Sequence, residues 1–196
     1  MEALKEAIRR EGVGIGSDIV KVDSFLNHRI DVALCTKMGQ AFYQAFQGEQ
    51  VDCILTVEAS GIAVAITTAQ AFGGIPVVFA KKAKGDSIEG GLYQAETYSY
   101  SYNGGPTLLI AKERLTARDA VLVIDDLLAK GDTLHSLLEI LSYAGAKVAG
   151  VGVVVEKGFQ EGGRLLRQEG VDLHSLAIID QAEERNIRFR HTSERQ

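Results

Sequence analysis

The sequence predicts an α/β fold with a central, mostly parallel sheet flanked by helices, and three observations support this class. First, short apolar runs alternate with longer segments in which apolar residues recur at helical spacing. Second, the segments 53–57, 62–72 and 75–80 follow one another as strand, helix and strand, an order that makes a right-handed parallel unit. Third, the apolar run 121–124 is followed by another helical segment, 133–143, so the order of strand and helix recurs.

Length and composition indicate one globular unit. The chain has 196 residues, of which 46% are hydrophobic and 24% charged, and this length suits one buried core better than two. We therefore expect a single domain over residues 1–196. The net charge of −5 argues against a nucleic-acid partner, because phosphate contacts require a basic surface.

The sequence offers no sign of a membrane partner or of an oxidising compartment. The apolar runs 148–155 and 75–80 are too short to span a bilayer, and the N-terminus is charged rather than signal-like. Cys35 and Cys53 fall in segments that resemble a helix and a buried strand. We expect free thiols, no disulfide, no metal site at the cysteines and a cytoplasmic location.

Two helices are expected before the first strand of the sheet. Leu4 and Ile8 indicate a short helix that ends at Gly12, and a helical stripe of apolar residues covers 31–46. The intervening segment 13–22 contains Gly-Val-Gly-Ile-Gly. It is not a dinucleotide-binding fingerprint, because β-branched residues follow the glycines where that motif requires a helix.

The pattern changes after the second strand. Residues 93–102 alternate between two sets of side chains, turn at 103–106 and continue into 107–111, which is typical of an antiparallel hairpin. The last part of the chain predicts strands at 148–155, 173–179 and 187–189, and a helix at 164–169.

The clearest chemical signal is the stretch from Val121 to Thr133. A buried strand is followed there by Asp125 and Asp126 and then by a small-residue loop that opens a helix. Ligands of open α/β sheets bind at the carboxyl ends of the strands, and loop amides at a helix N-terminus favour a phosphate. Paired carboxylates suit the hydroxyls of a ribose and the waters of a bound Mg²⁺. The two acids alone are equally consistent with a solvated turn that caps the helix, but the apolar run before them and the Gly-x-Thr after them favour the ligand site.

This stretch resembles the signature with which type I phosphoribosyltransferases bind phosphoribosyl diphosphate (PRPP): an apolar strand, two acids, two apolar residues and Ala-Thr-Gly-Gly-Thr. Lys130 and Asp132 depart from it. Asp132 brings a negative charge near the expected 5′-phosphate, and Lys130 offsets that charge. Further stretches resemble the bacterial purine phosphoribosyltransferases that act on xanthine, namely 20–28, 56–62, 76–82 and 155–160.

The resemblance implies a type I phosphoribosyltransferase fold with two attachments to the sheet. One is a flexible antiparallel hairpin lid over about 83–110, which closes to exclude water, and the other is a small hood formed by about 1–30 and 157–196. It also implies residue roles. Catalysis is assigned to Asp125, Asp126 and Lys81. PRPP binding is assigned to Ala129, Lys130, Gly131, Asp132, Thr133, Glu58, Ser60 and Gly61, and base binding to Val20, Asn27, Lys157 and Phe159.

Several of these residues also have simpler interpretations. Lys81 and Lys82 would on their own be a solvated basic cluster, Lys157 a surface lysine and Asn27 a helix cap. As a base-binding group, the Lys157 ammonium would donate to the 6-oxygen of an oxopurine, and it would meet only further donors on the amino group of adenine.

The expected reaction is the transfer of the phosphoribosyl group from PRPP to xanthine, with Mg²⁺ held through PRPP, diphosphate and water near Asp125 and Asp126 rather than by direct protein ligands. The resemblance also implies a homodimer. Two alternatives stay open from the sequence: an adenine or guanine/hypoxanthine phosphoribosyltransferase, and a non-catalytic PRPP-binding regulator on the same fold.

Overall fold

The structure is a computed structural model that describes residues 1–15, 19–21, 25–26, 28–83, 91–97, 106–183 and 186–190. Its centre is an eight-stranded sheet in the order β10-β9-β8-β7-β3-β4-β6-β5, and a separate two-stranded sheet pairs β1 with β2. The strands are β1 (Val13–Ile15), β2 (Ile19–Lys21), β3 (Cys53–Val57), β4 (Val77–Ala83), β5 (Leu92–Glu96), β6 (Thr107–Ala111), β7 (Ala120–Leu128), β8 (Lys147–Lys157), β9 (Leu173–Glu183) and β10 (Asn186–Phe189).

The five central strands β9, β8, β7, β3 and β4 are parallel, and the outer strands pair antiparallel to their neighbours. The predicted α/β class with a mostly parallel sheet is therefore confirmed. The helices are α1 (Glu2–Glu11), α2 (Val32–Phe46), α3 (Gly61–Ala71), α4 (Asp132–Ala144) and α5 (Gly162–Gln168), with a 3-10 turn at Lys112–Arg114. No helix in the described part of the chain has the length and apolar character needed to cross a membrane.

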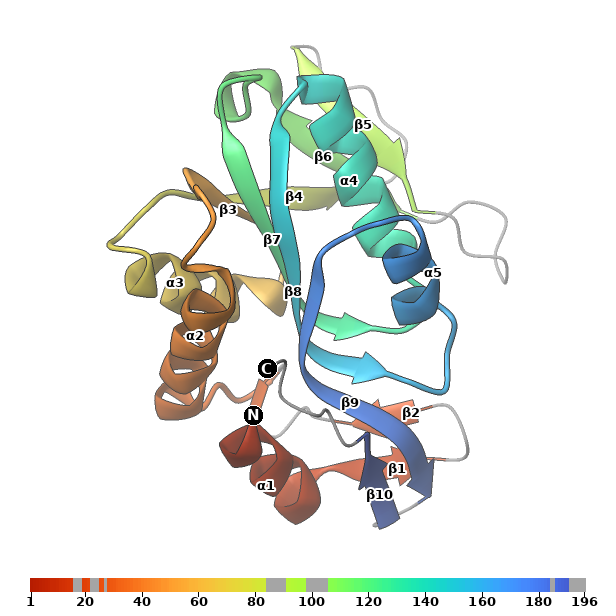
Figure 1. Cartoon of the computed structure of the whole chain (residues 1–196). Coiled ribbons are helices and arrows are strands. Elements are labelled where there is room, and N and C mark those ends of the chain that lie inside the picture. The colour runs from red at the N-terminus through yellow and green to blue at the C-terminus, as the bar shows by residue number, and fades with distance from the viewer. Residues whose placement is uncertain are drawn as a thin grey trace.

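Two apolar cores lie on opposite faces of the sheet (Figure 1). One joins α1, α2 and α3 to the sheet through side chains such as Ile8, Phe42 and Val64. The other lies under α4 and α5 and includes Leu137 and Leu166. Both faces are covered because the strands between them are apolar on both sides, as parallel sheets require.

The helices and strands expected from the sequence are present, with boundaries shifted by a few residues. One boundary was predicted wrongly in a way that matters for the site. The strand was expected to end at Ile124, directly before Asp125 and Asp126, but β7 continues to Leu128, and Leu128 still pairs with Glu156 of β8. The ladder to β8 therefore holds both acids within a strand.

Helix α1 and the strands β1, β2 and β10 lie together in the lower part of the molecule in Figure 1. Helix α1 packs against β9 and β10, and β1 packs against β9. The N-terminal amine of Met1 donates to the carbonyl oxygen of Leu176, which attaches the start of the chain to β9.

The predicted hairpin is confirmed in its paired part, where Leu92–Glu96 runs antiparallel to Thr107–Ala111. Strand β6 also pairs with Lys81–Ala83 of β4, so the hairpin extends the central sheet. The second half of the predicted alternating segment, with Tyr98, Tyr100 and Tyr102 on one side, lies outside the described residues.

Candidate active site

Four segments meet at the carboxyl edge of the parallel strands. The end of β4 carries Lys81 and Lys82, the loop after β3 is 58–60, the loop after β7 is 129–131, and β8 ends at Lys157. These segments meet because β3 pairs in parallel with both β4 and β7, and β7 pairs in parallel with β8. Residues up to 100 positions apart in sequence thus share the edge at which parallel α/β sheets bind ligands.

The two acids of β7 are buried at this edge. The exposed fractions of Asp125 and Asp126 are 3% and 8%, and the backbone N–H of Asp126 donates to Asp125 Oδ1 at 3.0 Å. Burial, followed by repulsion from the Asp126 carboxylate, raises the pKa of Asp125 well above its usual range, while the charge of Lys82 acts in the opposite direction. The pair is therefore short of positive charge, which suits a site that receives hydroxyl donors or a cation.

The turn between β3 and α3 approaches Asp125 closely. A Cβ added to Gly61 would lie 2.2 Å from Thr56 Oγ1 and 3.4 Å from Asp125 Oδ1, so only glycine fits there. The Thr56 hydroxyl is buried and has no hydrogen-bond partner in the described part of the protein. In the same turn, the peptide bond from Glu58 to Ala59 is cis, and Ser60 precedes the first residue of α3.

The two lysines of β4 differ in their surroundings. The backbone N–H of Lys82 donates to Glu58 Oε1 at 2.6 Å, and the charge of its side chain reaches Asp125. Successive side chains of a strand point to opposite faces, so Lys81 points away from the side on which Lys82 lies. Both lysines are exposed. The assignment of Lys81 to catalysis stays a prediction, and Lys82 is the lysine that the geometry connects to the acids.

The loop after β7 surrounds a cavity of about 250 Å³, whose lining includes all of Ala129, Lys130, Gly131, Asp132 and Thr133 together with Asp125. Gly131 has a φ of +96°, a left-handed conformation that favours glycine, and it precedes α4. Asp132 is the first residue of α4, and the helix start has no side-chain cap. The cavity thus combines a helix N-terminus with loop backbone, an arrangement suited to a phosphate.

Helix α5 and His135 support this loop from outside. The N–H of Gly162 donates to the carbonyl of Ala129 at 3.2 Å, and a Cβ on Gly162 would come within 2.5 Å of that oxygen. His135 Nδ1 lies 2.9 Å from the Gly131 carbonyl oxygen, and Nε2 lies 3.0 Å from Glu169 Oε2. These two contacts connect the loop backbone through the His135 ring to Glu169, at the end of α5.

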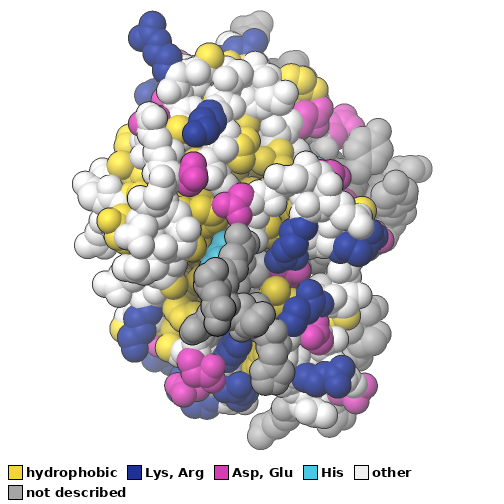
Figure 2. All heavy atoms as spheres, viewed as in Figure 1, with side chains coloured by type: hydrophobic (Ala, Val, Ile, Leu, Met, Phe, Trp, Pro, Cys, Tyr) yellow, Lys and Arg dark blue, Asp and Glu magenta, His cyan; other side chains and the backbone are white. Residues whose placement is uncertain are grey.

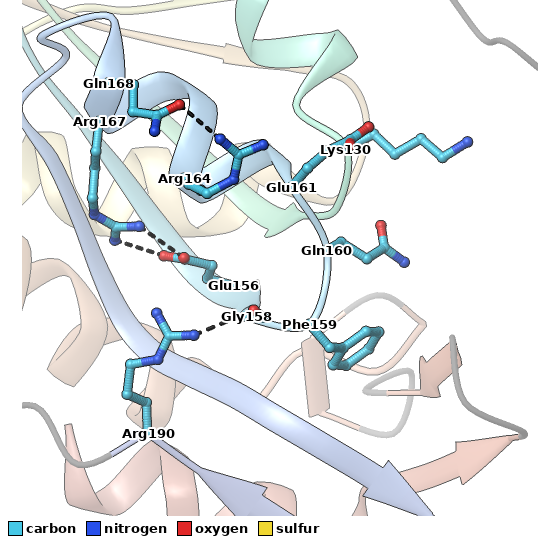
Figure 3. Close-up of a pocket in the computed structure, with 10 residues that line it drawn as sticks. All are labelled: Lys130, Glu156, Gly158, Phe159, Gln160, Glu161, Arg164, Arg167, Gln168 and Arg190. Atoms are coloured by element: carbon cyan, nitrogen blue, oxygen red, sulfur yellow. Dashed lines mark hydrogen bonds and ion pairs between the residues drawn. The ribbon is translucent and has the colours of Figure 1, made fainter.

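The proposed base-binding residues are only partly within the described structure. Lys157 is buried at the end of β8, with an exposed fraction of 9%, and Phe159 packs against the core that includes Phe25 and Leu26. Val20 belongs to β2, which pairs with β1, and Asn27 lies outside the described residues. Figure 3 shows the Phe159 ring turned away from Arg167 and Glu156.

Three further residues belong to the neighbourhood of the site and were not predicted from the sequence. Lys82 was named only as one of an equivalent pair, although strand alternation separates the two lysines. Gln160 lines the phosphate-loop cavity, and its proximity to Lys157 in sequence was the only available signal. His135 is four residues from Gly131, the spacing of one helical turn, but its partner Glu169 could not be found from the sequence.

Comparison with known proteins identifies the class to which this edge belongs. The chain is a member of the phosphoribosyl transferase family, because the phosphoribosyl transferase domain matches residues 21–187. The confirmed family agrees with the type I phosphoribosyltransferase fold that the sequence implied.

Similar proteins over nearly the whole chain include three xanthine phosphoribosyltransferases. That of Bifidobacterium longum subsp. infantis is 47% identical and covers 97% of this chain and 100% of its own. That of Ruminiclostridium cellulolyticum is 45% identical, and the match covers 96% of this chain and 99% of the relative. That of Clostridioides difficile is 43% identical, and the match covers 97% of this chain and 100% of the relative.

Solved structures share the fold at low identity. Adenine phosphoribosyltransferase from Giardia lamblia, complexed with 9-deazaadenine, superposes with a TM-score of 0.72 at 20% identity and covers 89% of this chain and 96% of its own. Adenine phosphoribosyltransferase from Rhodothermus marinus superposes with a TM-score of 0.69 at 17% identity, and the match covers 91% of this chain and 99% of its own. At such identities the likeness defines the fold alone.

Proposed function

We propose that this protein transfers the 5-phosphoribosyl group of PRPP to N9 of xanthine, forming xanthosine 5′-monophosphate and diphosphate in purine salvage. The observation that supports this most directly is the carboxyl edge of the sheet. There Asp125, one of the two buried acids of β7, lines the cavity of the phosphate loop and lies close to the Gly61 turn. The family and the similarity to xanthine phosphoribosyltransferases favour the same reaction.

In this proposal the PRPP molecule extends across three segments. Asp125 and Asp126 accept hydrogen bonds from the ribose hydroxyls, and the loop Ala129–Thr133, with Lys130, Gly131 and Asp132, holds the 5′-phosphate. Glu58, Ser60 and Gly61 surround the diphosphate, and Lys81 together with Lys82 offsets its charge. Catalysis then consists of positioning and of electrostatic stabilisation as the ribose carbon becomes positive and diphosphate leaves.

The donor groups at this edge fit Mg²⁺. Magnesium usually keeps several of its waters and is held largely by substrate phosphates, and Asp125 and Asp126 provide carboxylate oxygens that can accept hydrogen bonds from those waters. Burial, followed by repulsion from Asp126, raises the pKa of Asp125, so positive charge nearby would favour its ionised form. A bound Mg²⁺ would supply that charge and neutralise the diphosphate.

Base recognition falls to Val20, Asn27, Lys157 and Phe159. Lys157 brings a buried donor to the end of β8, which favours a 6-oxopurine over adenine. Phe159 provides an aromatic face for the base. In this proposal the packed terminal segments, about 1–30 and 157–196, form a hood over the base within a single domain.

We also propose a cytoplasmic homodimer. Four large apolar side chains are exposed on or beside α2, α3 and β4, which lie next to one another: Ile30, Val32, Ile66 and Phe79, with exposed fractions of 48%, 68%, 54% and 41%. Figure 2 shows apolar side chains on the side of the molecule where α2 and α3 lie. Exposed apolar patches of this kind mark interfaces. A sedimentation measurement that gives a mass near 21.1 kDa would contradict the dimer.

The test of the function is diphosphate release from PRPP with xanthine, guanine, hypoxanthine and adenine, each with and without Mg²⁺. We expect strong preference for xanthine and no turnover without Mg²⁺. Preference for adenine would overturn the base assignment, and PRPP binding without turnover on any base would favour the regulator.

A variant sharpens the base assignment. Lys157→Met should lower kcat/KM for xanthine by about 10- to 100-fold, the value of a hydrogen bond from a charged donor. The KM for PRPP should not change. Lys147→Met is the matched control, because Lys147 is the first residue of the same strand and lies at its opposite end.

A further inference from the structure

A second hollow, larger than the phosphate-loop cavity, lies beside α5. We name it the α5 hollow. It has a volume of about 820 Å³ and is lined by the end of β8, the turn that follows it, α5, Arg190 and the Lys130 side of the phosphate loop. This volume is within the range of small-molecule binding sites. Figure 3 shows its lining side chains, and Figure 2 shows Lys and Arg side chains gathered over this part of the surface.

The lining of the α5 hollow is basic although the protein carries a net charge of −5. Four cationic side chains and two carboxylates line it: Lys130, Arg164, Arg167, Arg190, Glu156 and Glu161. Positive charge concentrated in a concave surface attracts anions more strongly than the same charge on a flat one.

Two of the cations form ion pairs with neighbouring carboxylates. Arg167 forms a two-pronged ion pair with Glu156 at 2.7 and 2.8 Å, and Arg190 contacts Asp180 Oδ1 at 2.7 Å. Ser175 also donates to Glu156, so the pair joins α5 to β8 and β9. These contacts hold the shape of the hollow and leave little net charge on either arginine.

The other two cations are not neutralised. Within the described ranges of the chain, no carboxylate lies within ion-pair distance of Lys130 or Arg164. Among the described residues, the guanidinium of Arg164 donates only to the amide oxygen of Gln168 at 2.7 Å, which leaves further N–H groups without a partner in this part of the protein. A planar guanidinium with free donors is the group best suited to bind a phosphate.

The α5 hollow adjoins the phosphate-loop cavity. Lys130 and Gln160 line both spaces. The Oε1 atom of Gln160 is buried and has no hydrogen-bond partner among the described residues, so it offers an unused acceptor between the two spaces.

The hollow borders the proposed base site at Phe159, which lines it, and extends from there toward α5. Glu156 lines the hollow, and successive side chains of a strand point to opposite faces, so Lys157 faces the other side of β8. Amide groups from Gln160 and Gln168 complete a lining that suits the polar edge of a heterocycle.

We propose that the α5 hollow binds a nucleotide-sized phosphorylated ligand, with its phosphates on Arg164 and Lys130, and that this ligand weakens PRPP binding. The second part rests on the proposed function, since it requires PRPP in the adjacent loop. Two anions that share Lys130 repel each other, so the coupling is negative, and by linkage PRPP weakens the ligand by the same factor.

The test uses ADP as the probe and calorimetric titration of the full chain at low ionic strength, with increasing fixed concentrations of PRPP and Mg²⁺. A separate ligand site predicts that the apparent Kd of ADP rises about 5- to 100-fold and then reaches a plateau. A Kd that rises in proportion to PRPP without limit would place ADP in the PRPP site and overturn the proposal, as would no ADP binding at all. PRPP binding is measured alone in the same series, so its absence would count against the proposed function and not against the hollow.

Variants locate the ADP site. Arg164→Gln should weaken ADP at least 10-fold and leave the KM of PRPP unchanged, and Arg164→Lys should retain part of the affinity. Arg118→Gln is the matched control, because Arg118 is exposed at the opposite edge of the sheet, before β7. Wild-type ADP affinity in a folded Arg164→Gln variant would overturn the assignment.

Discussion

The two strand–turn–helix units at the carboxyl edge, β3 to α3 and β7 to α4, perform similar tasks but are supported in different ways. In the first unit the turn is held from inside, because Gly61 packs on Thr56 and Asp125 with no room for a Cβ. In the second the loop is held from outside, by Gly162 of α5 and by the His135–Glu169 contact.

This difference explains which positions tolerate variation. Lys130 and Asp132 depart from the signature of the family, yet the loop they belong to is shaped by backbone contacts at Ala129 and by the left-handed Gly131. The Lys130 side chain is exposed, and that of Asp132 makes no capping hydrogen bond. Neither side chain determines the conformation of the loop, so the two departures are compatible with its shape. The Gly61 turn has no comparable freedom.

The largest effect is expected from Gly61→Ala, which tests the close packing of the first turn on Thr56 and Asp125. The added methyl would lie 2.2 Å from Thr56 Oγ1, so the turn must shift, and overpacking of this kind costs about 1–3 kcal/mol. Urea unfolding should show this loss, and the KM for PRPP should rise. The double variant Thr56→Ala with Gly61→Ala should recover part of both, because it removes the obstructing hydroxyl. A stability within about 0.5 kcal/mol of wild type for the single variant would contradict the contact.

Asp125 lies between the two units, and Asp125→Asn should separate stability from activity. We expect kcat/KM to fall about 10- to 100-fold, from the loss of charged hydrogen bonds to ribose. The free energy of unfolding should instead increase. Because burial raises the folded-state pKa of Asp125, its ionisation opposes folding: its contribution is fully present below about pH 4 and is lost as pH rises through the raised pKa.

The melting temperature of Asp125→Asn, compared with wild type across this pH range, checks the sign. The stabilisation of the variant should grow as pH increases. A variant that is less stable than wild type at neutral pH and equal to it in acid would show that the carboxylate is compensated in the folded protein.

Substitutions of Gly131 test the backbone conformation of the loop after β7. Its φ of +96° is costly for alanine, by about 1–2 kcal/mol, and less so for asparagine. The KM for PRPP should therefore rise more in Gly131→Ala than in Gly131→Asn. Equal effects of the two substitutions would indicate that lost space beside His135, and not the backbone angle, is responsible.

The smallest effect is expected at the contact between His135 and Glu169, which supports the phosphate loop from outside. Glu169→Gln keeps the size of the side chain and removes its charge, and His135→Gln removes both ring contacts. About half of the Glu169 side chain is exposed, so screening limits its pair with His135 to about 0.2–1 kcal/mol. We expect a rise in the KM for PRPP of up to about fivefold with kcat unchanged. A change in kcat without a change in KM would show that His135 does not act through the phosphate loop.

Much of the molecule was predictable because its signals are local. The apolar run 121–124, the two acids after it and the loop up to Thr133 lie within 13 consecutive residues, and the structure places Asp125 and the loop at one cavity. The boundary of that strand was not predictable. The polar acids suggested that the strand ends at Ile124, but β8 runs alongside as far as Glu156 and provides hydrogen-bond partners that extend β7 to Leu128.

The sequence by itself determined the order of helices and strands, the parallel class of the sheet and the positions of the acids and the phosphate loop, because periodicity and turn chemistry act over a few neighbouring residues. Only the tertiary structure decided which lysine reaches Asp125, why Gly61 admits no side chain and how Glu169 supports a loop 38 residues earlier in the chain. These features depend on strand register and on contacts between distant segments. Such contacts form only when the sheet has assembled, and no local pattern in the sequence specifies them.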